Sequence, residues 1–197
     1  MLAIFDVEGV LLDAEFLPIL AEKINKQDEI WDITRQGIEG KINWEEGLKK
    51  RIEILRGIDY DTCKEVADSL KIMTGAKEAC RALKAAGWKI MAVSGGFTIM
   101  TDRLKKELDL DYIFSNKLVF KDGKLDGVTI DVDSDKAKSA IIKVREWEEE
   151  KKNIVVVVDG ANDIKLFDIC GLGVAFRAQD MVKELATVTL EEKDLSK

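Results

Sequence analysis

The feature that most constrains the fold is a series of short apolar runs that each stop at a polar loop. Three of these runs end at Asp6, Ser94 and Asp159 and cover residues 1–5, 89–93 and 154–158. Runs of this length, separated by stretches with helical spacing, are typical of strands in a buried parallel sheet. The alternation predicts an α/β fold with a mostly parallel sheet and helices on both of its faces.

Residues 14–72 interrupt this alternation with helical patterns alone. Apolar residues between Phe16 and Ile24 recur at the spacing of an amphipathic helix, and the segment contains no convincing strand. We therefore predict a small helical cap, residues 14–72, inserted after the first strand. The remaining residues, 1–13 and 73–197, are predicted to form the sheet-containing core.

The composition excludes several classes of function. The chain of 197 residues contains no histidine, so Ser-His and Cys-His nucleophilic machinery, imidazole acid–base catalysis and histidine metal sites are excluded. Lys and Arg total 31 and Asp and Glu total 38, and this net charge of −7 argues against nucleic acid as the main partner. A small phosphorylated substrate needs only a few local cations, and it is compatible with this charge.

The cysteines and the lack of long apolar runs bear on the compartment. Cys63, Cys80 and Cys170 are an odd number without C-x-x-C spacing, which argues against a zinc cage or a disulfide framework. No run approaches the ~20 apolar residues that are needed to cross a bilayer. We therefore expect a soluble cytoplasmic protein with no membrane partner. Monomer and homodimer both remain open.

The polar loops at the strand ends are expected to meet, because the carboxyl ends of parallel strands lie at one edge of the sheet, where ligands bind. Asp6, Asp159 and Asp163 would bring hard oxygen ligands of the kind that Mg²⁺ prefers. The Ser94-Gly95-Gly96 segment before a predicted helix would offer N–H groups and a hydroxyl to an anion. Each loop alone could be a turn or a helix cap. Together they predict a site for a metal and a phosphate.

Four motifs follow one another along the chain in a fixed order. The first three are Asp6-Val7-Glu8-Gly9-Val10, the V-S-G-G-F segment 93–97, and a lysine at the head of a later helix, for which Lys138 fits best and Lys136 is the alternative. The fourth, at 158–163, is a variant of G-D-G-A-N-D. In this order they resemble the haloacid dehalogenase (HAD) superfamily, and within it the phosphoserine phosphatase branch. The resemblance spans essentially the whole chain and implies a HAD-like, Rossmann-type core.

The resemblance implies the chemistry of the site. Asp6 would be the nucleophile that forms an aspartyl-phosphate, and Glu8 would be the general acid and base. Phosphate oxygens would be held by Ser94, Lys138 and Asn162. The Mg²⁺ ligands would be Asp6, Glu8 (through its backbone carbonyl), Asp159 and Asp163.

The resemblance also implies the substrate. Glu15 and Arg51 match positions where the branch recognises the amino-acid part of phosphoserine, and Gly95 would approach the ligand through its backbone. Glu15 would meet the ammonium group, and Arg51 would bind the carboxylate in a bidentate fashion. The expected reaction is the Mg²⁺-dependent hydrolysis of L-phosphoserine to L-serine and phosphate, a step of serine biosynthesis.

Two positions depart from the family pattern. Glu8 stands where the family has a second aspartate, and Val158 replaces the glycine before Asp159. The extra methylene of Glu8 could displace its carboxylate by roughly 1 Å, and a misplacement of that size can cost on the order of 10²-fold in rate. Two other functions therefore stay open. One is a phosphatase or phosphotransferase for phosphohomoserine or a sugar phosphate, and the other is a catalytically weakened, phosphate-binding regulatory homologue.

Overall fold

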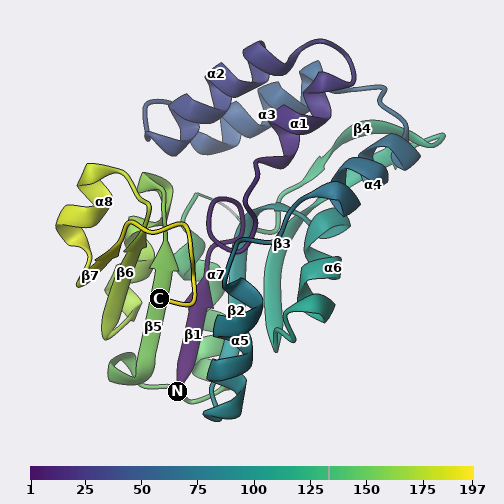
Figure 1. The fold of residues 1–197 in the computed structure, drawn as a ribbon. Coiled ribbons are helices and arrows are strands. Elements are labelled where there is room, and N and C mark those ends of the chain that lie inside the picture. The colour runs from purple at the N-terminus through teal and green to yellow at the C-terminus, as the bar shows by residue number, and fades with distance from the viewer. Residues whose placement is uncertain (133) are drawn as a thin grey trace.

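A computed structural model describes residues 1–132 and 134–197, and its centre is a seven-stranded sheet in the order β4-β3-β2-β1-β5-β6-β7 (Figure 1). The strands are β1 (Leu2–Phe5), β2 (Lys89–Phe97), β3 (Tyr112–Lys121), β4 (Lys124–Thr129), β5 (Ile154–Val158), β6 (Leu172–Phe176) and β7 (Val188–Leu190). Every neighbouring pair is parallel except β3 and β4, which are antiparallel. The predicted mostly parallel sheet is confirmed.

Helices cover both faces of this sheet. The later helices are α5 (Ala76–Ala85), α6 (Thr98–Glu107), α7 (Lys136–Glu146), α8 (Asp180–Leu185) and the 3₁₀ helices η1 (Lys151–Asn153) and η2 (Ala161–Ile169). Side chains alternate across a strand. Accordingly, Ala3 and Phe5 of β1 join the apolar cluster under α5 and α6. Leu2 and Ile4 join the second cluster, under α7 and α8. The α/β fold class is therefore confirmed.

The segment predicted as a cap contains four helices. They are α1 (Phe16–Glu22), α2 (Gln27–Ile38), α3 (Trp44–Ile54) and α4 (Tyr60–Ser69). Figure 1 shows α1, α2 and α3 above the carboxyl ends of the strands, whereas α4 runs beside α6. The two connections between this segment and the rest of the chain run side by side and are hydrogen-bonded to each other. Asp13 N–H donates to Lys71 O at 2.9 Å, and Met73 N–H donates to Leu11 O at 2.9 Å. The division into cap and core stays a prediction.

The structure corrects one boundary near the site. The strand expected at 89–93 continues as β2 to Phe97, so the Ser94-Gly95-Gly96 segment lies within the strand, and helix α6 begins only at Thr98. The pairing of β2 with β3 shifts register between Val93 and Phe97. An irregularity of this kind locally disrupts the pairing of two strands and re-aims the side chains of the affected strand. No helix among the described residues is long and apolar enough to cross a membrane.

Candidate active site

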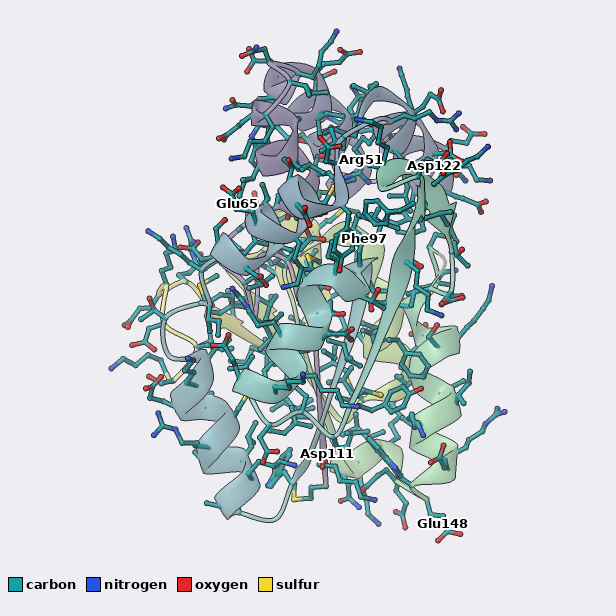
Figure 2. All side chains as sticks on the ribbon, turned by 90° about the vertical axis from the view of Figure 1, so that its right-hand side faces the viewer. Arg51, Glu65, Phe97, Asp111, Asp122 and Glu148 are labelled. Carbon is teal, nitrogen blue, oxygen red and sulfur yellow. The ribbon has the colours of Figure 1, made fainter. Side chains whose placement is uncertain are left out.

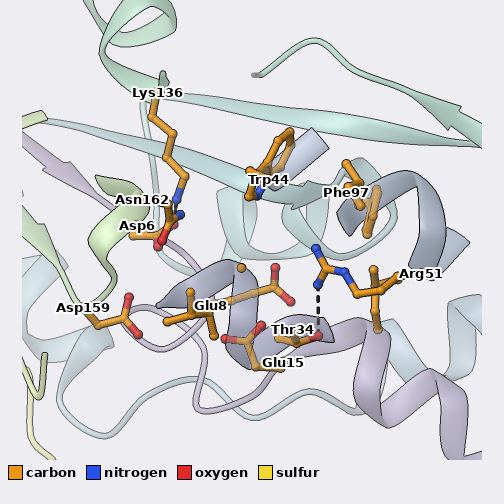
Figure 3. Close-up of a pocket in the computed structure, with 15 residues that line it drawn as sticks. Asp6, Glu8, Glu15, Thr34, Trp44, Arg51, Phe97, Lys136, Asp159 and Asn162 are labelled. Carbon is orange, nitrogen blue, oxygen red and sulfur yellow. Dashed lines mark hydrogen bonds and ion pairs between the residues drawn. The ribbon is translucent and has the colours of Figure 1, made fainter. Parts of the chain in front are cut away.

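A pocket lies between the carboxyl ends of the strands and the helices α1 to α3. Its polar lining from the sheet side consists of Asp6, Glu8, Gly95, Lys136, Asp159 and Asn162. The helical side of the pocket adds Glu15 from just before α1, Thr34 from α2 and Arg51 from α3. Figure 3 shows Asp6 and Lys136 at one end of the pocket and Arg51 at the other, with Glu8 and Glu15 between them. The pocket therefore brings together most of the residues that sequence reasoning selected at distant positions, but Lys138, Ser94 and Asp163 do not line it.

Asp6 is buried at the end of β1, and its side chain is held in one orientation. The Val7 N–H and the Lys136 ammonium both donate to Oδ1 of Asp6, each at 2.7 Å. A carboxylate that is fixed in this way loses little freedom when it reacts, which is the basis of catalysis by positioning.

The lysine beside Asp6 is Lys136, and the preference for Lys138 was wrong. Lys136 is the first residue of α7, its side chain is 4% exposed, and its Nζ lies 2.7 Å from Oδ1 of both Asp6 and Asp163. The Lys138 side chain is 70% exposed. Two positions along an α-helix turn the side chain by roughly 200°, so both lysines cannot face the site. Burial opposes the charge of Lys136, but Asp163 and Asp6 outweigh it and raise its pKa above the ordinary value.

Three carboxylates meet beside this lysine. Asp6, Asp159 and Asp163 each offer a ligand oxygen, and these atoms all lie within 4.8 Å of one another. Oδ2 of Asp163 is buried and has no hydrogen-bond partner among the described residues. Burial, reinforced by the charge of Asp6, raises the pKa of Asp159 to about 7. A divalent cation would supply the missing partner and stabilise the three charges, so the donor set fits a hard metal ion.

Gly9 gives the first motif room to approach this cluster. Its φ of +81° lies in the left-handed region, and a Cβ at this position would run into the carboxylate of Asp159, coming within 2.8 Å of the carboxyl carbon. Both facts require glycine here. The Gly9 of the first motif therefore serves the contact between the loops that follow β1 and β5.

Glu8 reaches towards the helices above the sheet. Its Oε1 accepts a hydrogen bond at 2.7 Å from the N–H of Phe16, the first residue of α1. Burial raises the pKa of Glu8, and the charge of Asp6 adds to the effect although the Phe16 hydrogen bond opposes it. The side chain is not part of the carboxylate cluster. The expected contribution of its backbone carbonyl to the metal stays a prediction.

Of the residues that follow Val93 in β2, Gly95 contributes most directly to the pocket wall. Ser94 is buried, and its Oγ accepts the N–H of Gly96 at 2.9 Å, so Ser94 lies behind the residues that line the pocket. Gly95 does line it, and a Cβ there would come within 2.9 Å of the Trp44 ring. The carbonyl of Gly95 also accepts a hydrogen bond at 2.8 Å from the side chain of Asn116, which sequence reasoning missed.

Asn116 connects the end of β2 to the segment that precedes α7. Its Oδ1 accepts the N–H groups of Asp131 and Val132 at 2.9 and 2.8 Å, while its amide nitrogen donates to Gly95. The side chain is buried, so its hydrogen bonds need these partners. Nothing in the sequence separates this asparagine from an ordinary strand residue, because its partners come from segments that only the fold brings together.

Glu15, the residue before α1, and Arg51 of α3 face the same pocket. Burial raises the pKa of Glu15 well above its usual range, and Glu8 and Asp159 add to the shift while Arg51 opposes it. Burial also lowers the pKa of Arg51. Figure 2 shows Arg51 in the helical layer and Phe97 below it. The pocket wall also includes apolar residues that helical spacing alone could not distinguish from packing residues: Leu17, Ile38, Trp44, Leu48 and Phe97.

Known proteins place this arrangement in a family. A model of the haloacid dehalogenase-like hydrolase family matches residues 1–167. The chain belongs to this family. It is 36% identical over 197 residues to the phosphoserine phosphatase of Methanocaldococcus jannaschii, with 98% of this chain and 93% of that protein covered.

Other members of this hydrolase family show the same likeness. The chain is 37% identical over 198 residues to the phosphoserine phosphatase of Archaeoglobus fulgidus, but it spans only 57% of that protein's length and 98% of its own. A solved structure described as a phospho-aspartyl intermediate analogue of phosphoserine phosphatase superposes with a TM-score of 0.94 at 34% identity, covering 98% of this chain and 94% of the other.

The two departures from the HAD motifs differ in their surroundings. Val158 is fully buried in β5 and packs in the apolar cluster under α7, so its side chain lies away from the pocket. Glu8 lines the pocket and contacts the first residue of α1. Of the two, Glu8 is therefore the departure that can affect the chemistry.

Proposed function

We propose that this chain is a Mg²⁺-dependent phosphoserine phosphatase that hydrolyses L-phosphoserine to L-serine and phosphate by way of a phosphorylated Asp6. The observation that carries the proposal is the pocket itself. It joins a carboxylate held by Lys136 to a pair of opposite charges, Glu15 and Arg51, that matches an amino acid. The similarity of the chain to phosphoserine phosphatases supports the same activity.

Asp6 is the nucleophile in this proposal. One of its carboxylate oxygens forms a bond to phosphorus while the bond from phosphorus to the serine oxygen breaks. Lys136, 2.7 Å from Oδ1, offsets the negative charge that accumulates as the phosphate approaches a carboxylate. We propose that Asn162, which lines the pocket, and Ser94, which lies behind it, help to hold the phosphate group of the substrate.

Asp6, Asp159 and Asp163 would hold the Mg²⁺ ion, with the carbonyl of Glu8 as a further ligand. When bound, the ion offsets charge on the transferred phosphoryl group. The buried, unpartnered Oδ2 of Asp163 supports this assignment, because a buried carboxylate oxygen needs a partner.

Glu8 moves the protons. In the first step its carboxyl group donates a proton to the serine oxygen that leaves phosphorus. In the second step its carboxylate takes a proton from the water that attacks the phosphorylated Asp6, and this step releases phosphate and restores both side chains. Burial holds the pKa of Glu8 above its ordinary value, which favours the protonated form that the first step needs.

Glu15 and Arg51 select the substrate. The ammonium group of serine would sit beside Glu15, whose charge is destabilised by burial and by its acidic neighbours. The carboxylate would be bound by Arg51. We further propose that residues 14–72 act as a cap over the site, and that the protein works in a reducing cytoplasm, which its free, buried cysteines support.

The test is phosphate release from phosphoserine and from a panel that includes phosphohomoserine, sugar phosphates and p-nitrophenyl phosphate, with and without Mg²⁺. We expect phosphoserine to be preferred and Asp6→Asn to lower turnover by at least about 10³-fold. If phosphoserine is no better than the generic ester, the substrate assignment fails. If Asp6→Asn keeps full activity, the mechanism fails.

The contact between Glu8 and Phe16 favours a second candidate, a phosphate-binding homologue with weakened turnover. In that case the hydrogen bond at 2.7 Å would hold the Glu8 carboxylate away from the leaving oxygen. Such a protein would bind a phosphate analogue tightly without turning over, and Glu8→Asp would restore hydrolysis.

A further inference from the structure

The guanidinium of Arg51 is held from two sides by the protein itself. Its Nε donates to the carbonyl of Gly47, one turn earlier in α3, at 3.2 Å, and its Nη1 donates to Oγ1 of Thr34 in α2 at 3.1 Å. Figure 3 shows the Thr34 contact at the pocket end that Arg51 forms. Thr34 is only 2% exposed, yet it lines the pocket.

These two contacts leave a defined part of the guanidinium for a ligand. The group carries five N–H donors in a rigid plane, and two of them are taken by Gly47 and Thr34. One N–H group on Nη1 and both N–H groups on Nη2 remain for a ligand. A pair of N–H groups on a guanidinium matches the two oxygens of a carboxylate.

A side chain as long as that of arginine has many rotamers, and a ligand that must select one of them binds more weakly. The Gly47 contact alone fixes only the Nε side of the group. The Thr34 hydroxyl fixes the rotation of the plane, and it does so from a different helix, so that α2 and α3 jointly aim the fork into the pocket.

We propose that Thr34 is a positioning residue that acts through Arg51 and sets the preference of this pocket for phosphomonoesters that carry a carboxylate. This inference rests on the proposed function, because it concerns the amino-acid end of the same site. The chemistry of the ligand follows from the geometry, since a fork aimed in advance favours a planar, two-oxygen anion over a hydroxyl or an apolar group.

The test compares two substrates and three variants. O-Phosphoethanolamine has the phosphate and the ammonium group of phosphoserine but lacks the carboxylate, so it does not need Arg51. Thr34→Val keeps the shape of the side chain and removes the acceptor, and Thr34→Ser keeps the hydroxyl. Thr62→Val makes the same change in α4, outside this pocket.

We expect Thr34→Val to raise the KM for phosphoserine about tenfold with kcat changed by less than about twofold, which is the size of effect expected when one hydrogen bond to a charged group is lost. The kcat/KM for O-phosphoethanolamine should change by less than about twofold. Thr34→Ser should recover most of the loss, and Thr62→Val should match the wild type.

A double-mutant cycle separates positioning from a merely structural role. Arg51→Ala removes the group that Thr34 is proposed to aim, so adding Thr34→Val to it should leave the KM for phosphoserine unchanged. The inference is overturned if Thr34→Val leaves the KM for phosphoserine unchanged, if it impairs both substrates equally, or if its effect persists in the Arg51→Ala background. If the wild type hydrolyses both esters equally well, the proposed function fails. If the wild type prefers phosphoserine but Thr34→Val does not change its KM, only the inference about Thr34 fails, so the two failures are distinguishable.

Discussion

Lys136 Nζ lies 2.7 Å from Oδ1 of Asp6, although the two residues are 130 positions apart in the chain. The contact joins the first residue of α7 to the loop that follows β1 and buries a cation against the carboxylate that we propose as the nucleophile. Four expectations follow from the surroundings of this pair.

The first concerns the choice between the two lysines of α7. Lys136→Met should lower kcat by at least about 10³-fold, because the charge beside the transferred phosphate is lost. Lys138→Met, a matched change at an exposed position, should stay within about twofold of the wild type. Steady-state phosphate release with Mg²⁺ at saturation checks both variants. The reverse ranking of the two variants would show that the lysine is misassigned.

The second concerns proton transfer. Glu8→Gln keeps an oxygen that can accept the Phe16 N–H but cannot exchange the proton, so kcat should fall by about 10²- to 10⁴-fold while the unfolding midpoint stays the same. Glu8→Asp keeps the carboxylate and should retain at least about tenfold more activity than Glu8→Gln. Glu8→Gln activity within about threefold of the wild type would exclude Glu8 as the acid and base.

The third concerns pH. Burial raises the pKa of Asp159 from 3.8 to about 7, so the folded, metal-free protein binds this proton more tightly than the unfolded chain does. The resulting stability is complete below pH 3.8 and is lost as the pH rises towards 7. In EDTA, Asp159→Asn should therefore be more stable than the wild type at pH 8, by about 1 kcal/mol or more, and much closer to it at pH 4. Urea unfolding at the two pH values measures the difference.

The same proton competes with the metal. Below pH 7 the wild type should lose affinity for Mg²⁺ by up to about tenfold per pH unit, because the ion binds the deprotonated carboxylate. Calorimetric titration of Mg²⁺ at pH 6 and pH 8 tests this slope. An affinity that does not change over this range would mean that Asp159 is not a ligand.

The fourth concerns Gly9. Gly9→Ala places a methyl group in a left-handed backbone and against the carboxylate of Asp159, so it should cost about 2–4 kcal/mol of stability and weaken Mg²⁺ binding. Gly123→Ala is the matched control. Its φ is +76° but a Cβ there has nothing within 4 Å, so only the backbone cost of about 1 kcal/mol is expected. Equal losses in the two variants would show that the Asp159 contact does not matter.

Much of the fold could be predicted because its signals are local. The apolar runs that became β1 and β5 and the helical spacing between Phe16 and Ile24 each reflect short-range periodicity, which a single segment carries by itself. The end of β2 was misplaced because its last residues pair with β3 across a register shift, and that pairing depends on a distant strand.

The sequence by itself determined the α/β class, the lack of imidazole chemistry and the acidic residues that follow the strands, Asp6, Asp159 and nearby Asp163, because residue types and periodicity are properties of the chain alone. Only the tertiary structure decided that Lys136, and not Lys138, meets Asp6, because the direction of a side chain depends on the phase of its helix against the sheet. It likewise decided that Thr34 contacts Arg51 and that Asn116 ties Gly95 to the segment before α7. These contacts join segments that are distant in sequence, and only packing sets the distances between them.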